Sequence, residues 1–478
     1  MSTRQPRISI ARLAHAIRSA PWAFWRKDYS LLPNTSHPSS PDLSKHGPIR
    51  RRLVQTSLIC LGLLLIFSLF SYRHYHHSVD PYKQWEHIQS QADYSSDIED
   101  PMWGLTEEMG WVQSSEKGLA DLGTIAEEKY RLGPTDPHTY FNRLYEFASS
   151  LPTMIRLHAQ AELYYHLPPK SNFLPAPPAP FSQPPSMISY KHIHQTDKTF
   201  KNSEETRAWV NMNKADGWTL NFLDDQAAAA WTKDLFHDTD IEWAWDYMHR
   251  GVLRADFLRY LLPLVQGGVY SDVDTLPLRP IEQWGHVRVE YLDISVTDGS
   301  DWRSKLSTYP AVIVAIDVDV HAKKGWDKEW PRAVDICQWT LASVPNHPIF
   351  LDAVRRVVNS TRVVEAWEIW RAEEIVKLEE AGEDASDLRG QHRDHAMSVM
   401  EWTGPGLFSD SVMAFLLARY HVTWHRLRGL DHPLRIGDVL ILPITAFSPG
   451  GEADFGAEGP DSPQANVLHE SKEFVQPN

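Results

Sequence analysis

The spacing of hydrophobic residues changes several times along the chain, and the most uniform stretch lies near its start. Leu53–Ser71 contains nineteen residues and no charge, which is long enough for a helix to cross a hydrocarbon core of about 30 Å. A signal peptide fits poorly, because the run starts after 52 residues and no small-residue cleavage site follows it. A buried core helix would carry a polar stripe, and this run has none. We therefore expect a single transmembrane helix at residues 53–71.

The charges on either side of this run predict its orientation. Residues 1–52 contain ten Lys and Arg, whereas residues 72–100 contain two. Positive charge is enriched on the cytoplasmic side of membranes. We therefore expect residues 1–52 to form a cytoplasmic tail and the chain after the anchor to lie in a lumen, as in a type II membrane protein.

The segment after the anchor is polar and then rich in proline. Residues 72–167 show scattered helical periodicity, for example at Tyr140 and Leu144, which is typical of a stem with a few helices. Pro168–Pro185 contains eight prolines, and this density predicts an extended linker. A PxxP ligand for a docking domain is the alternative, and we favour the linker. Residues 72–185 are therefore interpreted as stem and linker.

Short apolar strands alternate with helices from Met187 onward. The pattern predicts strands at 188–196, 218–223, 269–270 and 311–316, and helices at 204–214, 227–231, 252–262 and 366–395. We expect Pro263 to end the third helix and the fourth to be charged and solvated. This alternation predicts an α/β fold with a mainly parallel sheet over residues 186–450, followed by an atypical tail at 451–478.

Two carboxylates follow the strand at 269–270. Asp272 and Asp274 lie where this short apolar strand ends, and ligands of open α/β sheets bind beyond the carboxyl ends of strands. Residues two apart on an extended chain point the same way, so both carboxylates can face one cation. Such oxygen ligands suit Mn²⁺ or Mg²⁺, and these ions neutralise a departing diphosphate. The pattern favours metal-assisted transfer from a nucleotide donor.

The residues before this pair separate it from a chance occurrence. Gly267 and Gly268 allow the backbone to approach a ligand closely. The preceding helix carries Arg254 and Arg259 as candidates for phosphate and Asp256 as a candidate for a ribose or sugar hydroxyl. An exposed ladder of ion pairs is the structural alternative for that helix, because Asp256 and Arg259 lie three residues apart.

Two other pairs of potential metal ligands lie two residues apart, but neither follows a glycine turn and a helix with arginines as Asp272 and Asp274 do. Asp317 and Asp319 follow the strand at 311–316 without a glycine turn, and we assign them a supporting or acceptor-side role. His192 and His194 lie two apart in the opening strand, where packing is the simpler role.

Composition limits the class of protein. A formal net charge of −15 argues against a nucleic-acid partner, because a phosphate backbone needs a basic face. A hydrophobic content of 42 % is enough for a sizeable core. The two cysteines, Cys60 and Cys337, exclude a fold that depends on a disulfide framework.

Several motifs occur in the order found in glycosyltransferase family 32, the DXD-containing sugar transferases. The chain resembles that family most closely in RADFLRYLLPLVQGGVYSDVDTLPLRPI at Arg254–Ile281. KHIHQT (Lys191–Thr196) precedes this run, and TGPGLFSDSV (Thr403–Val412) and GDVLILPITAFSPG (Gly437–Gly450) follow it. The resemblance covers about residues 187–450 and is greatest to a fungal branch, the initiation-specific α-1,6-mannosyltransferases of the Golgi.

The resemblance implies a GT-A fold, a GDP-mannose donor, Mn²⁺ and retention of anomeric configuration. It also implies an N-glycan acceptor on glycoproteins, a Golgi membrane location and membership of a mannosyltransferase complex. The residues implied at the donor are Asp225, Arg254, Asp256, Arg259, Gly268, Asp272, Gly404 and Gly406, and those implied at the metal are Asp272, Asp274 and His469. No residue stands out as a catalytic nucleophile.

The C-terminal end departs from the family pattern. Members close with a histidine, an aromatic residue and a Gly-Ser/Thr-Trp-Lys run, whereas this chain ends VLHESKEFVQPN. His469 corresponds to that histidine, and the Trp-Lys element has no counterpart, which predicts an altered closure of the donor site. We attribute the difference to an incorrectly assigned final exon. A histidine in a disordered tail is the alternative for His469.

Other functions share some of these features. Another family 32 activity, on a lipid or glycan acceptor, is one alternative; an enzyme with a lipid acceptor would be expected to bring more apolar surface or a second span, and the sequence after Ser71 has no second span. A non-catalytic subunit of a mannosyltransferase complex would explain the altered C-terminus, but it has no need to hold the like charges of Asp272 and Asp274 together. A metal-dependent hydrolase would add histidines at ligand spacing.

Overall fold

The computed structural model describes residues 125–168, 171–177, 189–292, 309–320, 325–451 and 455–469. The chain divides into two units, Met1–His77 and Ser78–Asn478, and every described residue belongs to the second unit. None of the helices in these ranges combines the length and the apolar character needed to cross a membrane. This corrects our fold-class prediction, which included a transmembrane helix. The run that we assigned to it, Leu53–Ser71, lies outside the described residues, as do residues 1–52.

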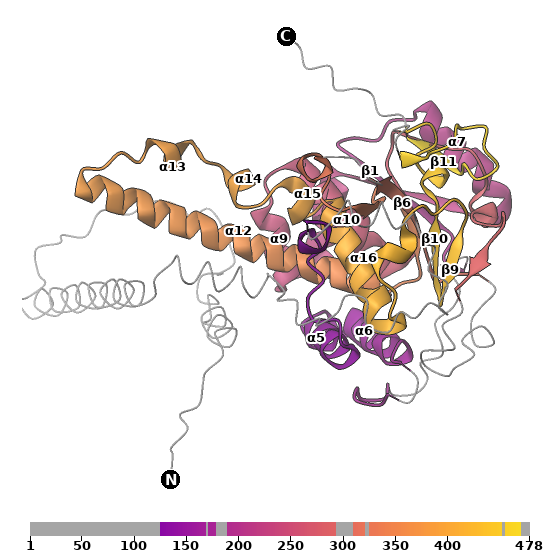
Figure 1. Ribbon diagram of the computed structural model, residues 1–478, viewed down its shortest axis with the longest axis horizontal. Helices are drawn as coiled ribbons and strands as arrows, with labels where there is room; N and C mark the ends of the chain where they lie inside the picture. Colours follow the sequence, from indigo (N-terminus) through magenta and orange to yellow (C-terminus); the bar gives the residue numbers. More distant parts are fainter. Residues whose placement is uncertain are drawn as a thin grey trace, which may run out of the picture. The chain divides into compact units, whose positions relative to one another are not determined.

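A nine-stranded sheet forms the centre of the described unit (Figure 1). The strand order is β2-β1-β3-β8-β6-β10-β9-β5, and β7 pairs with β6. The strands are β1 (His192–Asp197), β2 (Thr219–Asp224), β3 (Gly268–Ser271), β5 (Glu290–Tyr291), β6 (Val312–Asp319), β7 (Val334–Ile336), β8 (Thr340–Ser343), β9 (Leu434–Ile436) and β10 (Val439–Leu442). A separate two-stranded sheet pairs β4 (Thr275–Pro277) with β11 (Val467–His469).

The main strands of the large sheet point in one direction. β1 pairs in parallel with both β2 and β3, and β6 pairs in parallel with β10. β8 lies between β3 and β6 and is antiparallel to both, so β3 and β6 share a direction. The predicted α/β fold with a mostly parallel sheet is confirmed, and β5, β7, β8 and β9 run in the opposite direction to the main strands. The carboxyl ends of β1, β2, β3 and β6 therefore meet at one edge.

Helices cover the sheet and connect its strands. They are α5 (Pro137–Ser149), α6 (Thr153–Tyr165), α7 (Glu204–Asn213), α8 (Asp225–Leu235), α9 (Asp240–Tyr247), α10 (Gly251–Gln266), α12 (Pro348–Ala381), α13 (Ser386–Gly390), α14 (Arg393–Ala396), α15 (Val399–Trp402) and α16 (Pro405–Tyr420). Alternate side chains of β6 enter two hydrophobic clusters: Val314 and Ile316 contribute to one, and Ile313 and Ala315 to the other. The sheet thus separates two cores, because successive side chains of a strand point to opposite faces.

Helices α5 and α6 come from the segment that we interpreted as a stem. Tyr140, Phe141 and Leu144 of α5 are buried in the same cluster as Val354 and Val357 of α12. α5 also packs directly on α6 and α12. These two helices therefore belong to the larger hydrophobic core.

Two predicted helix boundaries were wrong. α10 continues through Pro263 to Gln266, because Pro263 lies close to the C-terminal end and the Gly267 N–H still closes a turn on its carbonyl at 3.0 Å. The single helix expected at 366–395 is instead the second half of α12, which ends at Gly382 with φ of 74° and is followed by α13 and α14. Glycine accepts this left-handed conformation without strain.

A buried cluster joins α6 to the rest of the fold. His166 faces acceptors on both sides: its Nδ1 lies 2.7 Å from the Glu162 carbonyl oxygen, and its Nε2 lies 2.6 Å from Asp438 Oδ2. The His347 Nε2 lies 3.1 Å from the same carboxylate oxygen, and Tyr420 donates to the other at 2.7 Å. Both nitrogens of His166 must carry protons to donate in this way.

These donors can approach a metal, since the side-chain atoms of His166, His347 and Asp438 lie within 4.8 Å of one another. The hydrogen bonds argue against it. His347 Nδ1 accepts from the Ile349 N–H at 3.2 Å, which leaves the ring proton on Nε2 and no lone pair there for a cation. We interpret the cluster as a hydrogen-bonded latch.

We expect this latch to weaken as pH rises. Burial alone lowers the pKa of His166, but Asp438 outweighs it and raises the pKa above its usual value; burial raises the pKa of Glu162 to about 7. Both groups hold a proton in the folded state that the unfolded chain has lost, so the free energy of unfolding should fall between about pH 5 and pH 8. Urea unfolding across this range should show a steeper fall for the wild type than for a His166→Gln, Glu162→Gln variant. Parallel slopes would contradict this.

Candidate active site

The chain turns sharply after β3, and this turn places two carboxylates at the carboxyl edge of the sheet. The Asp272 N–H donates to the Trp339 carbonyl at 2.9 Å, and the Thr275 N–H donates back to the Asp272 carbonyl at 3.2 Å. Asp272 to Asp274 therefore form a turn and not the extended chain that we expected, so the prediction that both carboxylates point the same way was wrong. Asp272 contacts α10, whereas Asp274 contacts β11.

Asp272 is bound by an arginine of α10. Arg259 donates through Nε to Asp272 Oδ1 at 3.2 Å and through Nη2 to Oδ2 at 2.5 Å. Its third nitrogen, Nη1, donates to Asp256 Oδ1 at 2.7 Å. One guanidinium thus bridges two carboxylates. Burial raises the pKa of Asp272, with Arg259 opposing the shift, and burial raises the pKa of Asp256 to about 6.

Asp256 lies beneath Arg259 rather than at the surface. It is 2 % exposed and accepts from Thr403 Oγ1 at 2.8 Å. Gln338 donates to it at 3.4 Å, and Tyr260 in turn donates to Gln338 Oε1 at 2.5 Å. The helix α10 therefore contributes a buried carboxylate that orients Arg259 toward Asp272. The alternative of an exposed ion-pair ladder on this helix correctly gives the contact between Asp256 and Arg259, but the pair is buried and not exposed.

Asp274 faces a histidine from the C-terminal segment. β11 pairs with β4 so that His469 lies opposite Thr275. His469 Nε2 is 3.5 Å from Asp274 Oδ1, and the imidazole stacks on Trp339 with ring centres 4.8 Å apart. Burial lowers the pKa of His469, but Asp274 outweighs it and raises the pKa. His469 is therefore held in a strand and is not part of a free tail.

The residues present fit a divalent cation. Asp274 and His469 remain 47 % and 27 % exposed and face each other with one oxygen and one nitrogen donor. Carboxylate and imidazole ligands together suit Mn²⁺ better than Mg²⁺, which prefers oxygen alone. Asp272 gives both oxygens to Arg259, but a carboxylate has about four lone-pair sites and can still contribute. Asp274 and His469, with Asp272 beside them, would hold the metal.

We expect His469→Ala to weaken Mn²⁺ binding about tenfold or more, because it removes a candidate ligand and its contact with Asp274. Electron paramagnetic resonance during Mn²⁺ titration measures free ion directly. His392→Ala, at an exposed histidine after α13, is the matched control and should leave the affinity unchanged. Equal affinity in both variants would remove His469 from the site.

Three other predicted residues have different surroundings. Arg254 donates to the Trp245 carbonyl at 3.2 Å and lies over the Trp245 ring at 5.2 Å. Asp225 is exposed at the first turn of α8, after the cap Asp224. Gly268 begins β3, whereas Asp272 follows its other end, and a Cβ at Gly268 would lie 2.4 Å from the His192 carbonyl oxygen. Gly268 allows β3 to pack closely against β1.

The residues just before α16 contact the buried side chains of α10 that support the site. The Thr403 and Gly404 carbonyls accept from Tyr260 at 2.7 and 3.2 Å. A Cβ at Gly404 would lie 2.6 Å from Met400 Cα, and one at Gly406 would lie 2.8 Å from Pro331. These glycines permit close packing of α15 and α16, which places Thr403 on Asp256.

Some neighbours of the site were missed by sequence reasoning. Gln195, within the KHIHQT motif, is buried and donates to the Asp272 carbonyl at 3.4 Å. Trp339 stacks on the His469 ring, and no sequence motif predicted this contact. The two aspartates of β6 separate: Asp317 accepts from Ser448 at 2.9 Å, while Asp319 accepts from the Gly429 N–H at 2.5 Å. The position of Gln195 within the KHIHQT motif was the one sequence feature that could have identified it.

Known proteins are similar over this region. Residues 187–290 match the family described as glycosyltransferase sugar-binding region containing DXD motif. The chain is 36 % identical to the initiation-specific alpha-1,6-mannosyltransferase of Schizosaccharomyces pombe over 52 % of this chain and 53 % of that protein. It is 26 % identical to the protein of that name in Candida albicans, over 48 % and 55 % of the two chains. The match thus spans about half the length of these relatives.

A solved structure, the PaToxG glycosyltransferase, is 13 % identical with a TM-score of 0.26, covering 62 % of this chain and 92 % of that one. A likeness this low carries no argument. The family match covers the turn at Asp272–Asp274 (the DXD turn), the helix α10 and the strands β1 and β2. It confirms the resemblance to family 32 for these motifs. Residues 187–290 of this chain are therefore similar to a glycosyltransferase sugar-binding region containing a DXD motif.

Proposed function

We propose that this protein is a metal-dependent glycosyltransferase that transfers mannose from GDP-mannose to an N-glycan in α-1,6 linkage. The observation that carries the proposal is the pair of contacts at the DXD turn, Arg259 with Asp272 and His469 with Asp274. The names of the two fungal relatives support the choice of sugar and linkage. A location in the Golgi lumen, Mn²⁺ as the metal and a partner complex belong to the same proposal.

The side chains divide the work of the transfer between them. Asp274 and His469 would hold the metal, which would supply positive charge to the leaving diphosphate. Arg259 holds Asp272 in place and adds positive charge beside the diphosphate. Asp256, buried below, fixes the orientation of Arg259 through its contact at 2.7 Å. With the metal bound, the site would thus present positive charge where negative charge accumulates on the leaving group.

The experiment is a transfer assay with the purified full-length chain, GDP-mannose, Mn²⁺ and a Man8 or Man9 N-glycan. The expected product contains one added mannose in α-1,6 linkage, identified by linkage analysis, and EDTA should stop its formation. UDP-sugars in place of GDP-mannose test the donor, and a mannosylated lipid acceptor tests the other family activity.

Two outcomes would contradict the proposal. Transfer that persists in EDTA would exclude the metal. Binding of GDP-mannose without transfer to any acceptor would instead favour a non-catalytic subunit, for which the altered C-terminus is the relevant feature.

A further inference from the structure

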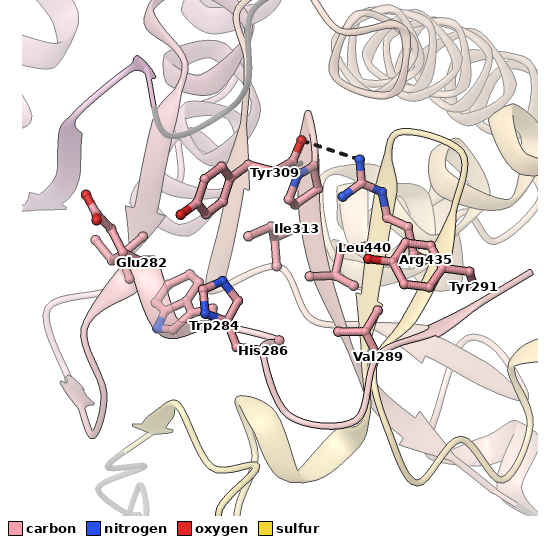
Figure 2. Close-up of a pocket in the computed structure, with 12 residues that line it drawn as sticks. Glu282, Trp284, His286, Val289, Tyr291, Tyr309, Ile313, Arg435 and Leu440 are labelled. Atoms are coloured by element: carbon pink, nitrogen blue, oxygen red, sulfur yellow. Dashed lines mark hydrogen bonds between the residues drawn. The ribbon is translucent and has the colours of Figure 1, made fainter. Parts of the chain in front are cut away.

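A pocket opens in the sheet away from the DXD turn. Its floor is formed by Ile313 and Leu440, which are neighbours in the parallel pair of β6 and β10 and lie near the start of both strands. Asp272 follows the opposite, carboxyl end of β3, whose direction β6 shares. The pocket has a volume of about 270 Å³, and Figure 2 shows the side chains around it. It is therefore separate from the donor site.

The fold builds this pocket by laying one segment closely over the sheet. Gly285 has φ of 69°, and a Cβ there would lie 2.5 Å from Leu440 Cδ2. Trp284 beside it is 2 % exposed and packs on Phe447 with ring centres 5.0 Å apart. The part of the wall formed by Trp284 and Gly285 is therefore held against the sheet.

A buried arginine lines the pocket without a carboxylate partner. Arg435 is 4 % exposed and donates through Nε to the Gly437 carbonyl at 2.7 Å and through Nη2 to the Tyr309 carbonyl at 3.4 Å. Within the part of the chain that the structure describes, no carboxylate forms an ion pair with it. Burial lowers the pKa of Arg435, and the nearby charge of Asp438 opposes this shift. A guanidinium has five N–H donors, so donors remain for a ligand.

The remaining walls combine aromatic rings with both donors and acceptors. Tyr291 lies opposite Arg435 in the pairing of β5 with β9 and is 49 % exposed. Tyr309 and His286 add groups that donate and accept, and Glu282 adds a carboxylate that already accepts from Lys191 at 2.7 Å. Figure 2 shows Glu282 and Arg435 on opposite sides of the pocket. A ligand with several hydroxyl groups can accept from Arg435 and donate to Glu282 at the same time, whereas an anion without donors can only accept.

We propose that this pocket binds one neutral hexose unit of an oligosaccharide, as a second carbohydrate site. A sugar ring offers hydroxyls for Arg435 and Glu282 and apolar C–H groups for the face of Tyr291. The volume lies just below the range of about 300–1,000 Å³ that holds drug-sized ligands, which suits a single ring. The rest of the oligosaccharide extends into solvent.

The identity of the hexose rests on the proposed function. An acceptor glycan that carries several mannose units can place one in this pocket while another is at the DXD turn, on the same or a second enzyme. The pocket then increases affinity for large acceptors without changing the chemical step. Tyr291→Ala should raise KM for a Man9 glycan and leave kcat, and KM for a simple mannoside, unchanged.

Direct binding tests the proposal without turnover. Isothermal titration of the full-length Asp272→Asn, Asp274→Asn protein with Man9 glycan should show binding, and adding Tyr291→Ala should weaken it about tenfold. Ile369→Ala, at a 47 % exposed residue of α12, is the matched control and should bind as the parent does. His286→Ala provides a second variant at the pocket rim.

The outcomes separate this proposal from the proposed function. Absence of glycan binding to the Asp272→Asn, Asp274→Asn protein, or equal binding with and without Tyr291, would overturn the second site even where transfer occurs. Competition by inorganic phosphate would also overturn it and identify an anion site at Arg435. If the wild-type chain shows no transferase activity but binds glycan in a way that depends on Tyr291, the second site would be supported and the proposed enzymatic function would be refuted.

Discussion

Replacing Asp272 and Asp274 together by Asn should lower kcat for mannosyl transfer at least about a thousandfold. The substitution removes two negative charges from the turn at which we propose that the metal and the diphosphate bind. It leaves Arg259 bound to Asp256 at 2.7 Å but without the carboxylate that holds its other two nitrogens. Metal affinity and donor orientation are therefore lost together, because one turn supplies both.

The single variants should separate these two effects. Asp274→Asn affects only the metal ligands Asp274 and His469 and leaves the contact between Arg259 and Asp272 intact. Excess Mn²⁺ should therefore restore part of the rate. Asp272→Asn disturbs Arg259 as well, and added metal should not restore the rate. Initial rates over a range of Mn²⁺ concentrations distinguish them.

A matched control changes the same net charge elsewhere. Glu380→Gln with Glu383→Gln removes two exposed carboxylates at the end of α12, and transfer should be unaffected. Circular dichroism should show that every variant is folded. Wild-type rates in the Asp272→Asn, Asp274→Asn protein would exclude the DXD turn from catalysis.

Replacing Arg332 by Met should cost about 3–5 kcal/mol of the free energy of unfolding. The Arg332 side chain is 0 % exposed and binds Glu401 at 2.7 Å and Asp410 at 2.6 Å. The variant leaves two carboxylates facing each other in the core with no cation between them. Breaking one side of a buried ion pair is costly for that reason, whereas removing all of its members need not be.

Urea unfolding measures this loss, and a compensating variant tests its cause. Adding Glu401→Gln and Asp410→Asn to Arg332→Met should recover much of the stability, since the unpaired charges are gone. Arg389→Met removes an exposed ion pair with Glu379 and should change stability by about 1 kcal/mol or less. No recovery in the triple variant would show that packing, and not charge, determines the loss.

Arg332 also bears on the active site through the helices that it joins. Glu401 lies in α15 and Asp410 in α16, and Thr403 between these helices donates to Asp256 at 2.8 Å. Loosening α15 and α16 should therefore release Asp256 and, through it, Arg259. Arg332→Met should lower transfer at temperatures where the protein remains folded.

The family and the alternation of elements could be predicted from the sequence because both are local patterns. Apolar spacing placed α7 and the strands β1, β2 and β6 within a few residues, since side-chain periodicity depends on neighbours in the chain. The motif around Asp272 placed two carboxylates after a strand. The sequence alone therefore identified the edge of the sheet that carries the candidate site.

The contacts of the site were decided by the tertiary structure. Arg259 and Asp256 come from α10, and Thr403 comes from the connection between α15 and α16. The packing of α15 and α16 determines which of them meet. The turn after Ser271 directs Asp272 and Asp274 to different partners, against the expectation from an extended chain. No spacing of residues predicts such a turn, because its hydrogen bond to Trp339 forms across the sheet.

The sequence by itself determined the carboxylate pair Asp272 and Asp274, the strand before it and the helix that supplies Arg259, because each depends on residues a few positions apart. The tertiary structure decided that Asp256 is buried, that His469 reaches Asp274 through the pairing of β11 with β4, and that Arg435 lines a pocket. These features depend on contacts between residues far apart in the chain, and burial and charge pairing at such contacts arise when the elements pack together.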